Sequence, residues 1–408
     1  MVSPRNHFLF TPLLASTTTG TLEFRCITEP IRHLDRIAYH QSRCMDIDAA
    51  QNEIVLRDSF ETSNIYRMPY DYLVYSVGSQ ANDFGISGVR QNALFLKQVR
   101  DAMQIRNKIQ ELFERASKPT SSRDDRDRLL SVVVVGGGPT SIEYTAELYD
   151  WLMEDGAKMF PELIDHVTIT LLEASDNILS MFGADLAEYT INRFRKRKIR
   201  VLTNSRVVRV EKEFVELQDG YQIPYGAVVW ATGLMPNTLT NNLGEWQKSK
   251  TGRICVTDHL TLHSPSYDNI FCIGDCAETI SGALPPTGQV ANQQGKYIAR
   301  KFNHVTAKPW SEFEQHFTEQ NKVSFNFVNR GTMAYIGGWK GVTSLPHHLD
   351  QDTKTNAFKR RFTRLQGLRA WLFWRSAYFT MLTSTANRIL VPMYWFKAWI
   401  FGRDFSRF

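Results

Sequence analysis

A short run of apolar residues near the middle of the chain ends in a cluster of glycines. Ser131 is followed by four valines, then by Gly136, Gly137 and Gly138, and then by apolar positions at helical spacing. β-Branched residues in a short, wholly apolar run are typical of a buried parallel strand, and glycines after it indicate a tight turn. The pattern predicts a strand at 131–135, a turn at 136–138 and a helix after it.

The hydrophobic pattern predicts further strands and helices on both sides of this turn. We expect a buried strand over 72–77 that ends at Gly78, and an apolar strand over 270–273 that ends in Gly274-Asp275. Other strands are expected at 54–57, 167–172 and 228–230, with a helix beginning near 287. An amphipathic helix is predicted over 98–116, with the apolar residues Val99, Ala102, Met103, Ile105, Ile109, Leu112 and Phe113. Strands alternating with helices indicate an α/β fold.

Composition and charge narrow the class of protein. The 408 residues are 43% hydrophobic and 22% charged, which suits two or three globular domains. A net charge of +6 suits an anionic membrane surface or a nucleic acid, but no Arg/Gly-rich tail or basic–aromatic block supports nucleic acid as a partner. The five scattered cysteines argue against a disulfide scaffold and favour a reducing compartment. No His, Cys or carboxylate cluster has metal-ligand spacing, so we expect no metal.

The glycine cluster has the spacing of a nucleotide-binding turn. Gly136-x-Gly138-x-x-Ser141 matches a pyrophosphate-binding turn with serine in the third glycine position. Backbone N–H groups at the start of the following helix would face the phosphates. The strand at 167–172 ends at Glu173, whose carboxylate would accept hydrogen bonds from the adenosine ribose hydroxyls and repel a 2′-phosphate. This favours NADH over NADPH. The alternative is that Glu173 is only a solvated strand end.

The distance along the chain from Gly138 to Glu173 is longer than usual for such a domain. The acidic residue normally follows about 20 residues after the glycines. We attribute the excess to Asp150–Asp165, interpreted as an inserted surface segment.

The C-terminal region is rich in aromatic residues. Residues 368–382 and 389–401 concentrate tryptophan, tyrosine and phenylalanine, and five basic residues interrupt or follow them: Arg369, Arg375, Arg388, Lys397 and Arg403. No uncharged apolar run is long enough to span a bilayer. We expect amphipathic helices that lie in a membrane interface, with basic groups meeting lipid phosphates. The alternative is a helical pair that packs on its own domain or on a second copy in a homodimer.

Motifs spread over the whole chain resemble one known family. They are the opening residues 2–14, the glycine turn at 134–140, Ala231-Thr-Gly233, Ile273-Gly-Asp275, Gly288–Gly295, Met333–Gly337 and Trp371–Tyr378. Together they resemble the type II (alternative, rotenone-insensitive) NADH:ubiquinone oxidoreductases in their mitochondrial form. The resemblance implies FAD-dependent oxidation of NADH, with electrons passed to ubiquinone in the respiratory chain without proton pumping. It also implies a peripheral position on the mitochondrial inner membrane.

The resemblance implies two dinucleotide-binding (Rossmann-like) domains and a C-terminal amphipathic region. We expect the first part of the FAD-binding domain at 1–110, the NADH-binding domain at 111–240, the second part of the FAD-binding domain at 241–320 and the membrane-associating region at 321–408. The implied cofactor-binding residues are Gly136, Gly137, Gly138, Pro139, Thr140, Glu173, Ala231, Thr232, Gly233, Gly274 and Asp275. Asp275 would accept hydrogen bonds from FAD hydroxyls, and the helix near 287 would direct its positive end at the flavin.

Four further residues match positions near the chemistry in this family. Glu143 would lie near nicotinamide and flavin and relay protons toward quinone; the alternative is a first-turn glutamate stabilised by the helix dipole. Gln289 and Gln293, four residues apart, would hydrogen-bond a quinone carbonyl, whereas Gln294 points elsewhere. Lys97 would help to neutralise the reduced flavin. The alternatives are a polar helix face and a solvated lysine.

One departure from the family bears on FAD. Residues 1–6 correspond to the end of the second strand of the family's first domain, so the sequence as written begins after the first strand and its glycine turn. From this we expect weak or absent FAD binding and exposed strand edges. An alternative function is a catalytically impaired isoform that binds NADH at a membrane. Another flavoprotein disulfide reductase is disfavoured by the absence of a C-x₂-C pair and by the aromatic tail.

Overall fold

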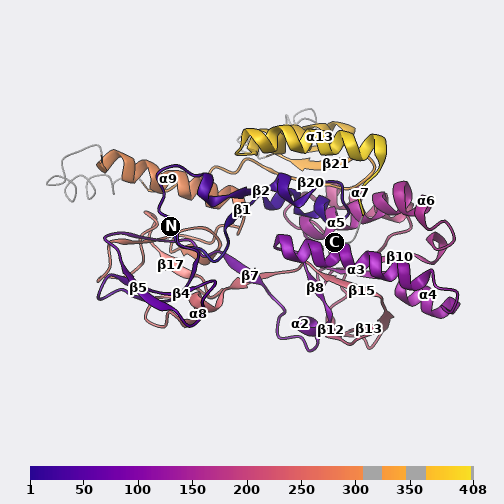
Figure 1. The fold of residues 1–408 in the computed structure, drawn as a ribbon, viewed down its shortest axis with the longest axis horizontal. Helices are drawn as coiled ribbons and strands as arrows, with labels where there is room; N and C mark the ends of the chain where they lie inside the picture. The colour runs from indigo at the N-terminus through magenta and orange to yellow at the C-terminus, as the bar shows by residue number, and fades with distance from the viewer. Residues whose placement is uncertain (307–323, 346–363, 406–408) are drawn as a thin grey trace, which may run out of the picture. The chain divides into compact units, whose positions relative to one another are not determined.

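The computed structural model describes residues 1–306, 324–345 and 364–405. These residues form two compact units, drawn as a ribbon in Figure 1. The first unit contains residues 1–7, 30–80 and 234–330, and the second contains 8–29, 81–233 and 331–408. Residues 81–110 and the C-terminal region group with the second unit. Residues 307–320 of the expected FAD-binding range, and 321–323, 346–363 and 406–408 of the C-terminal range, lie outside the described residues.

A five-stranded parallel sheet forms the centre of the second unit. Its strand order is β11 (Arg200–Leu202), β10 (Thr168–Leu172), β9 (Ser131–Val135), β15 (Ala227–Trp230) and β8 (Leu94–Phe95). All five residues of β9 are buried. Val132 and Val134 join the core beneath the helices, and Val133 and Val135 join a second core on the opposite face. The four valines are therefore a strand covered on both faces, which confirms the prediction from their apolar run.

Helices cover one face of this sheet and a small sheet covers the other. On the helical side lie α3 (Val99–Ala116), α5 (Pro139–Trp151) and α7 (Ala184–Lys196), with the short helix α4 (Arg123–Leu129) against α3. The short helix α2 (Val89–Asn92) contacts the opposite core through Val89. The antiparallel strands β12 (Val207–Val210), β13 (Phe214–Leu217) and β14 (Gln222–Pro224) pack on the opposite side. Helix α3 matches the predicted range and begins with a capping box between Gln98 and Asp101, but Met103 of its predicted apolar face is exposed.

The first unit is built from small sheets. β3 (Ser42–Asp48), β4 (Glu53–Asp58) and β5 (Ile65–Pro69) are antiparallel, β6 (Leu73–Tyr75) pairs with β18 (Ile270–Cys272), and β17 (Ile254–Val256) pairs with β19 (Ala277–Thr279). Helices α8 (Thr238–Asn242) and α9 (Gly288–Thr306) complete it. The predicted strand over 72–77 is wrong in length and burial. It has three residues, and Val74 is 40% exposed, because among the described strands β6 pairs only with β18.

Short elements connect the two units along the chain. The strand pairs β1 (His7–Leu9) with β2 (Thr28–Pro30), and β7 (Ser79–Ala81) with β16 (Leu234–Pro236), lie where the chain passes from one unit to the other. Between β1 and β2 the chain forms the 3₁₀ turn Thr11–Leu13, helix α1 (Leu14–Thr17) and the 3₁₀ turn Phe24–Ile27. A 3₁₀ turn at Ile31–His33 follows in the first unit.

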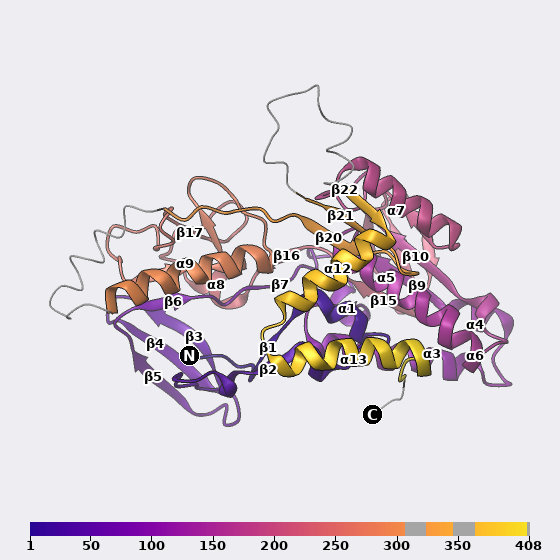
Figure 2. The same ribbon diagram turned by 90° about the horizontal axis from the view of Figure 1, so that it is seen from above.

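The C-terminal region ends in two helices that pack on the second unit. The strands β20 (Thr332–Tyr335), β21 (Gly341–Ser344) and β22 (Arg364–Gly367) form an antiparallel sheet, followed by α12 (Leu368–Met381) and α13 (Thr385–Phe401), as Figure 2 shows. Trp374, Val391 and Trp395 are buried in the main core. The two predicted helical segments are confirmed. Among the described helices none combines the length and hydropathy needed to cross a bilayer.

The segment Asp150–Asp165 lies only partly at the surface, so its interpretation as a surface segment is wrong for residues 150–152, 155, 156 and 163, which are buried. Helix α5 continues into a π-helical turn at Leu152–Gly156 and then α6 (Ala157–Met159), with a 3₁₀ turn at Ile164–His166. Trp151 is fully buried; its ring centroid lies 5.3 Å from that of Phe113 and 4.0 Å from that of Phe405. Aromatic packing from three distant segments therefore holds this part of the chain inside the core.

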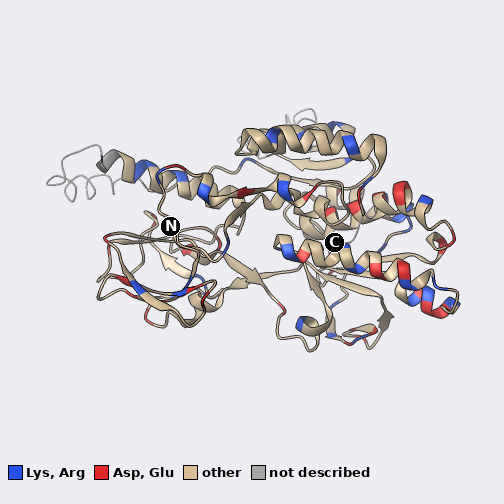
Figure 3. Cartoon of the chain, viewed as in Figure 1, with Lys and Arg blue, Asp and Glu red and all other residues tan. Residues whose placement is uncertain are grey.

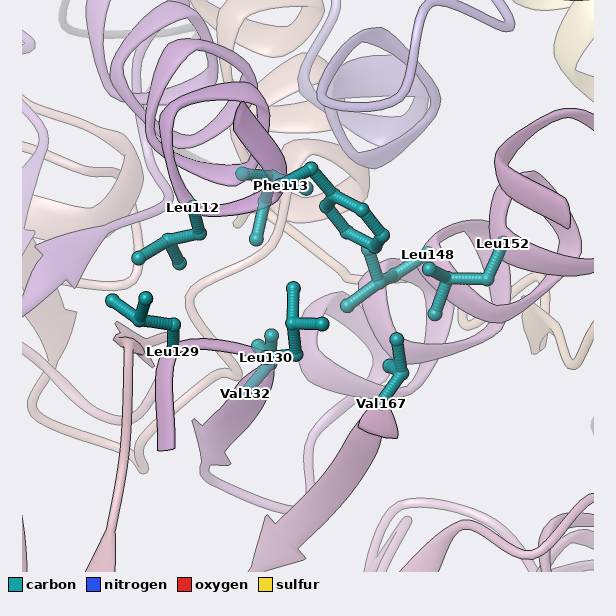
Figure 4. A pocket seen from close by; sticks show the side chains of 9 residues that line it. Leu112, Phe113, Leu129, Leu130, Val132, Leu148, Leu152 and Val167 are labelled. Carbon is teal, nitrogen blue, oxygen red and sulfur yellow. The ribbon is translucent and has the colours of Figure 1, made fainter. Parts of the chain in front are cut away.

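A small apolar void lies beside this packing, between α3, β9 and α5 (Figure 4). Its lining is formed by leucine, isoleucine, valine and phenylalanine side chains from Ile109 to Val167. None of the predicted site residues lines it, so this void is a feature of core packing and carries no catalytic group.

Candidate active site

The glycine turn requires glycine where the backbone approaches a neighbouring strand end. Gly136 has φ of 111°, and a Cβ atom built there would lie 2.9 Å from Thr232 Cβ and 3.0 Å from the Ala231 carbonyl oxygen. Gly138 is the N-cap of α5, and no atom lies within 4 Å of its virtual Cβ. Gly136 is therefore required for packing within the protein, and Gly138 keeps open the space before the helix N-terminus.

Ser141 and the Ala231–Gly233 segment complete the wall of the turn. Ser141 is fully buried and donates its hydroxyl to the Ala231 carbonyl at 3.2 Å. A serine therefore fits the position of the third glycine and adds a hydrogen bond between helix and strand end. Ala231 and Thr232 lie directly against Gly136, as the assignment of the Ala231–Gly233 segment to the cofactor site requires.

Glu173 also lies at the turn, and it is hydrogen-bonded. Its Oε2 accepts the Gly137 N–H at 2.5 Å, and its Oε1 accepts the backbone and hydroxyl groups of Ser175, both at 2.7 Å. The carboxylate is thus more than a solvated strand end, because it ties the end of β10 to the glycine turn. A carboxylate oxygen can accept about two hydrogen bonds, so the two bonds from Ser175 use Oε1 fully and one position stays open on Oε2 for a ribose hydroxyl.

Glu143 is buried in the first two turns of α5. Its side chain is 7% exposed, and Oε1 accepts the Tyr335 backbone N–H at 3.2 Å and the Trp374 indole N–H at 3.1 Å. Burial raises the pKa of this carboxyl to about 8, although the two donors favour the ionised form. A carboxyl that titrates near neutral pH is suited to receiving and releasing a proton.

Two further acidic residues of α5 were missed by sequence reasoning. Glu147 and Asp150 follow Glu143 at positions i+4 and i+7, on the same face of the helix, and both are buried. Asp150 accepts hydrogen bonds from Arg197 at 2.8 Å and from the Gly338 N–H at 2.9 Å. The spacing in the sequence is a usable signal, but the partners that keep these carboxyls buried lie far away along the chain.

Lys97 lies between β8 and the start of α3. Its side chain is partly buried, and its backbone N–H donates to Asp101 Oδ2 at 2.9 Å as part of the helix cap. The cap fixes the backbone of Lys97 at the carboxyl end of β8, where the parallel sheet carries its other site residues.

In the first unit, the Gly274-Asp275 turn is held by α9 and β7. Gly274 has φ of 77°, and its N–H donates to Gln294 Oε1 at 2.7 Å. Asp275 Oδ2 accepts the Ser79 hydroxyl at 2.8 Å. The expectation that Gln294 faces away from its two neighbouring glutamines is confirmed, and Gln294 has the structural role of fixing this turn.

Gln289 and Gln293 bind the same backbone segment. Gln289 Oε1 accepts the Arg330 N–H at 2.6 Å. Gln293 accepts the Val328 N–H at 3.0 Å and donates to the Val328 carbonyl at 2.9 Å. The two amides therefore share a helix face, as expected from their spacing, and that face holds residues 328–330 in place.

The geometry of the turn predicts that alanine has different effects at Gly136 and at Gly138. Gly136→Ala should lower the melting temperature, because the new methyl group meets Thr232 and the backbone is in the left-handed region. Gly138→Ala should leave the melting temperature unchanged and weaken NADH binding, because its methyl group enters only the open space before α5. Thermal melts and NADH titrations of both variants test this. Equal stability of the two variants, or unchanged NADH affinity in Gly138→Ala, would contradict it.

The raised pKa of Glu143 predicts that the protein loses stability as pH rises. Because its folded-state pKa is raised from 4.5 to about 8, its stabilising contribution is fully present below about 4.5 and is lost as pH rises through about 8. Glutamine stays neutral at every pH, so the Glu143→Gln variant does not lose this contribution. The free energy of unfolding of the variant minus that of the wild type should therefore be larger at about pH 9 than at about pH 5, by a few kcal/mol. Denaturation at both pH values measures the difference. A difference that is the same at both pH values would count against a raised pKa.

Comparison with known proteins agrees with this geometry. Residues 1–295 match the pyridine nucleotide-disulphide oxidoreductase family, and residues 329–404 match the NDH2 C-terminal domain. A probable NADH dehydrogenase of Dictyostelium discoideum is 42% identical over 412 residues, covering 100% of this chain and 85% of the relative. External NADH-ubiquinone oxidoreductase 2 of Saccharomyces cerevisiae mitochondria is 36% identical, covering 100% of this chain and 77% of the relative. NDH2 from Plasmodium falciparum in complex with NADH has a TM-score of 0.89 and 26% identity, covering 99% of this chain and 94% of that chain. The chain therefore belongs to the type II NADH:ubiquinone oxidoreductase (NDH2) family.

Proposed function

We propose that this chain oxidises NADH through FAD and reduces ubiquinone in the respiratory chain, without pumping protons, as a peripheral protein of the mitochondrial inner membrane. The observation that carries the proposal is the glycine turn at the N-terminus of α5, enclosed by Glu173 and Ala231–Gly233, in a fold shared with an NADH-bound NDH2. Relatives that cover the whole chain are named as NADH-ubiquinone oxidoreductases of mitochondria. A catalytically impaired NADH-binding isoform is therefore not favoured.

The NADH site is assigned to the second unit. The backbone N–H groups of Gly138, Thr140 and Ser141 would face the pyrophosphate, and Pro139 begins the first helical turn. Glu173 would keep its bond to Gly137 and accept the ribose hydroxyls, the second of them in exchange for a bond to Ser175. Ala231, Thr232 and Gly233 would form the opposite wall.

The FAD residues described in the first unit fit a flavin nucleotide. Gly274 in the left-handed region turns the chain after β18, Asp275 supplies a carboxylate at the strand end, and α9 begins at Gly288. When bound, FAD accepts hydride and passes electrons on singly or in pairs. The assignment of residues 1–110 and 241–320 to FAD, and of 111–240 to NADH, is part of the same proposal.

At the quinone end, both glutamines stay in the proposal. Their bonds to Arg330 and Val328 also hold the 328–330 segment. We propose that the amides of Gln289 and Gln293 meet a quinone carbonyl, and that Lys97 is the cation that balances negative charge on the reduced flavin.

The C-terminal helices are proposed to lie on a lipid surface. Apolar side chains stay exposed along both helices, including Phe373, Phe379, Ile389, Phe396 and Trp399. From residue 364 to residue 403 every charged residue is basic, and Figure 3 shows these charges as blue bands on the two helices. An apolar face with only basic charges suits an anionic bilayer.

Two of the five expected lipid-facing basic residues have another role. Arg375 lies between Trp371 and Trp395, with its guanidinium carbon 4.3 Å from each ring centroid. Arg403 is 8% exposed and pairs with Glu154 and Asp155. The expectation that these two groups meet lipid phosphates is wrong, because aromatic rings and carboxylates surround them. The exposed Arg369, Arg388 and Lys397 remain for that role.

The activity is tested by NADH-dependent reduction of a soluble ubiquinone analogue, with FAD supplied. We expect turnover that requires both NADH and quinone, and that is faster with NADH than with NADPH because Glu173 repels the 2′-phosphate. Spectrophotometry of NADH oxidation measures it. A chain that binds NADH but transfers no electrons under these conditions would instead support the impaired-isoform function.

Lipid binding is tested by sedimentation with vesicles that contain anionic phospholipid. Phe396→Ser with Trp399→Ser should weaken vesicle binding by about tenfold, because two large apolar side chains are removed from the exposed face. Phe60→Ser is the matched control: Phe60 is 81% exposed but lies in the first unit. Unchanged binding in the double variant would refute the lipid assignment. Loss of a dimer in light scattering would assign this face to a second copy.

A further inference from the structure

The proposed reaction requires one proton from solvent. NADH + H⁺ + ubiquinone gives NAD⁺ + ubiquinol: the hydride carries two electrons and one proton, and the second proton of ubiquinol comes from outside. If Glu143 supplies protons near the site, its own proton must be replaced after each turnover. Because Glu143 is buried and both of its donors are N–H groups with no proton to give, replacement requires another titratable group.

Glu147 has the position and the partners of such a group. It lies one helical turn after Glu143 and is 4% exposed. Its Oε1 accepts the Ser16 hydroxyl at 2.7 Å, and its Oε2 accepts the Thr21 hydroxyl at 2.6 Å and the Thr19 hydroxyl at 3.4 Å. In the described part of the chain every hydrogen bond to Glu147 comes from a hydroxyl. Hydroxyls both donate and accept, so they can pass a proton along, unlike N–H donors.

The hydroxyl cluster leads from Glu147 toward the surface. Thr19 and Thr21 lie 3.3 Å apart, and Thr21, the more exposed of the two, also accepts the Nε–H of Arg403 at 2.8 Å. Arg403 also pairs with Glu154, whose side chain is half exposed, but its guanidinium keeps its protons and does not pass them on. The proton-passing groups therefore run from Glu147 to Thr21, which is 8% exposed and is the outermost hydroxyl of the cluster.

From this arrangement we propose that Glu147 is a proton-relay residue that reprotonates Glu143 during quinone reduction. The Glu147 carboxyl gives its proton to the Glu143 carboxylate, and the Glu147 carboxylate then takes a proton from solvent through the hydroxyls of Thr21 and Thr19. No electrons move in these steps, and one proton enters for each ubiquinol formed. The proposal rests on the proposed function, which supplies the demand for a proton.

The groups around Glu147 act on its carboxyl in both directions, some favouring the protonated form and some the ionised form. Glu143 and Asp150 on α5 disfavour its ionised form, as does burial, which raises its pKa. Arg403 favours the ionised form. Arg375 on α12 and Tyr335 on β20 also lie within electrostatic range. A glutamine amide at this position could accept hydroxyls at its single oxygen only, so it would keep part of the link to residues 16–21 but could carry no proton.

The test separates the two half-reactions in the FAD-loaded chain. Glu147→Gln keeps the size and an acceptor oxygen but cannot carry a proton. Tyr144→Phe is the matched control, because Tyr144 is fully buried on the same helix and its hydroxyl has no hydrogen-bond partner in the described structure. Rapid mixing with NADH follows the loss of flavin absorbance, which takes up no solvent proton. Rapid mixing with quinone then follows its recovery, in H₂O and in D₂O.

We expect Glu147→Gln to keep the NADH half-reaction within about twofold of wild type and to slow the quinone half-reaction at least about tenfold, with an enlarged D₂O effect. Tyr144→Phe should match wild type in both. A further readout uses the cofactor-free chain: infrared spectra recorded through a pH titration should lose one titrating carboxyl band in Glu147→Gln.

Two results would overturn the relay. Wild-type rates in both half-reactions of Glu147→Gln would show that no proton passes through this residue. Equal slowing of both half-reactions, with a lowered melting temperature and no change in the D₂O effect, would assign Glu147 a structural role only. A wild-type chain that reduces no quinone would overturn the proposed function itself, and the relay with it, and is recognised before any variant is made.

Discussion

The second unit depends on keeping the carboxyl groups of helix α5 out of water. Glu143, Glu147 and Asp150 are buried on one side of the helix, and a buried carboxyl is tolerated only when its oxygens are hydrogen-bonded. The partners come from four distant parts of the chain: the hydroxyls at 16–21, Arg197, the backbone and tyrosine of 335–338, and the Trp374 indole. Removing one partner would leave a buried carboxyl oxygen without a hydrogen bond, so these segments are bound to α5 and through it to one another.

The same helix begins at the glycine turn. Its N-terminus presents N–H groups to the open space beside Gly138, and its interior carries groups that can hold protons. Hydride transfer needs geometry and charge balance more than an acid or a base, whereas quinone reduction needs a proton. In the proposed function, one helix would serve both needs. The Trp374 bond to Glu143 makes the C-terminal region of the chain part of this arrangement, because α12 both exposes Phe373 and buries Trp374.

Local patterns predicted the elements but not the long-range contacts. The valines of β9, the turn after them, helix α3 and the two C-terminal helices follow from periodicity and glycine position, which are properties of neighbouring residues. The strand expected at 72–77 was too long because its burial depends on how many strands lie beside it. Arg375 and Arg403 were expected to face lipid because a charged residue in an apolar segment gives no sign of the rings or carboxylates that enclose it. The burial of Asp155 and the bonds of Gln289 and Gln293 to residues 328–330 likewise need the tertiary structure.

The proposed function depends most on NADH binding at the N-terminus of α5, which amide hydrogen exchange measures residue by residue. Saturating NADH should slow exchange over residues 136–142 and leave the β3–β4–β5 sheet of the first unit unchanged, because a bound pyrophosphate covers the backbone N–H groups of the turn. Unchanged exchange over 136–142 in the presence of NADH, or protection confined to other segments, would contradict the site, and the roles given to Glu143 and Glu147 would lose their foundation.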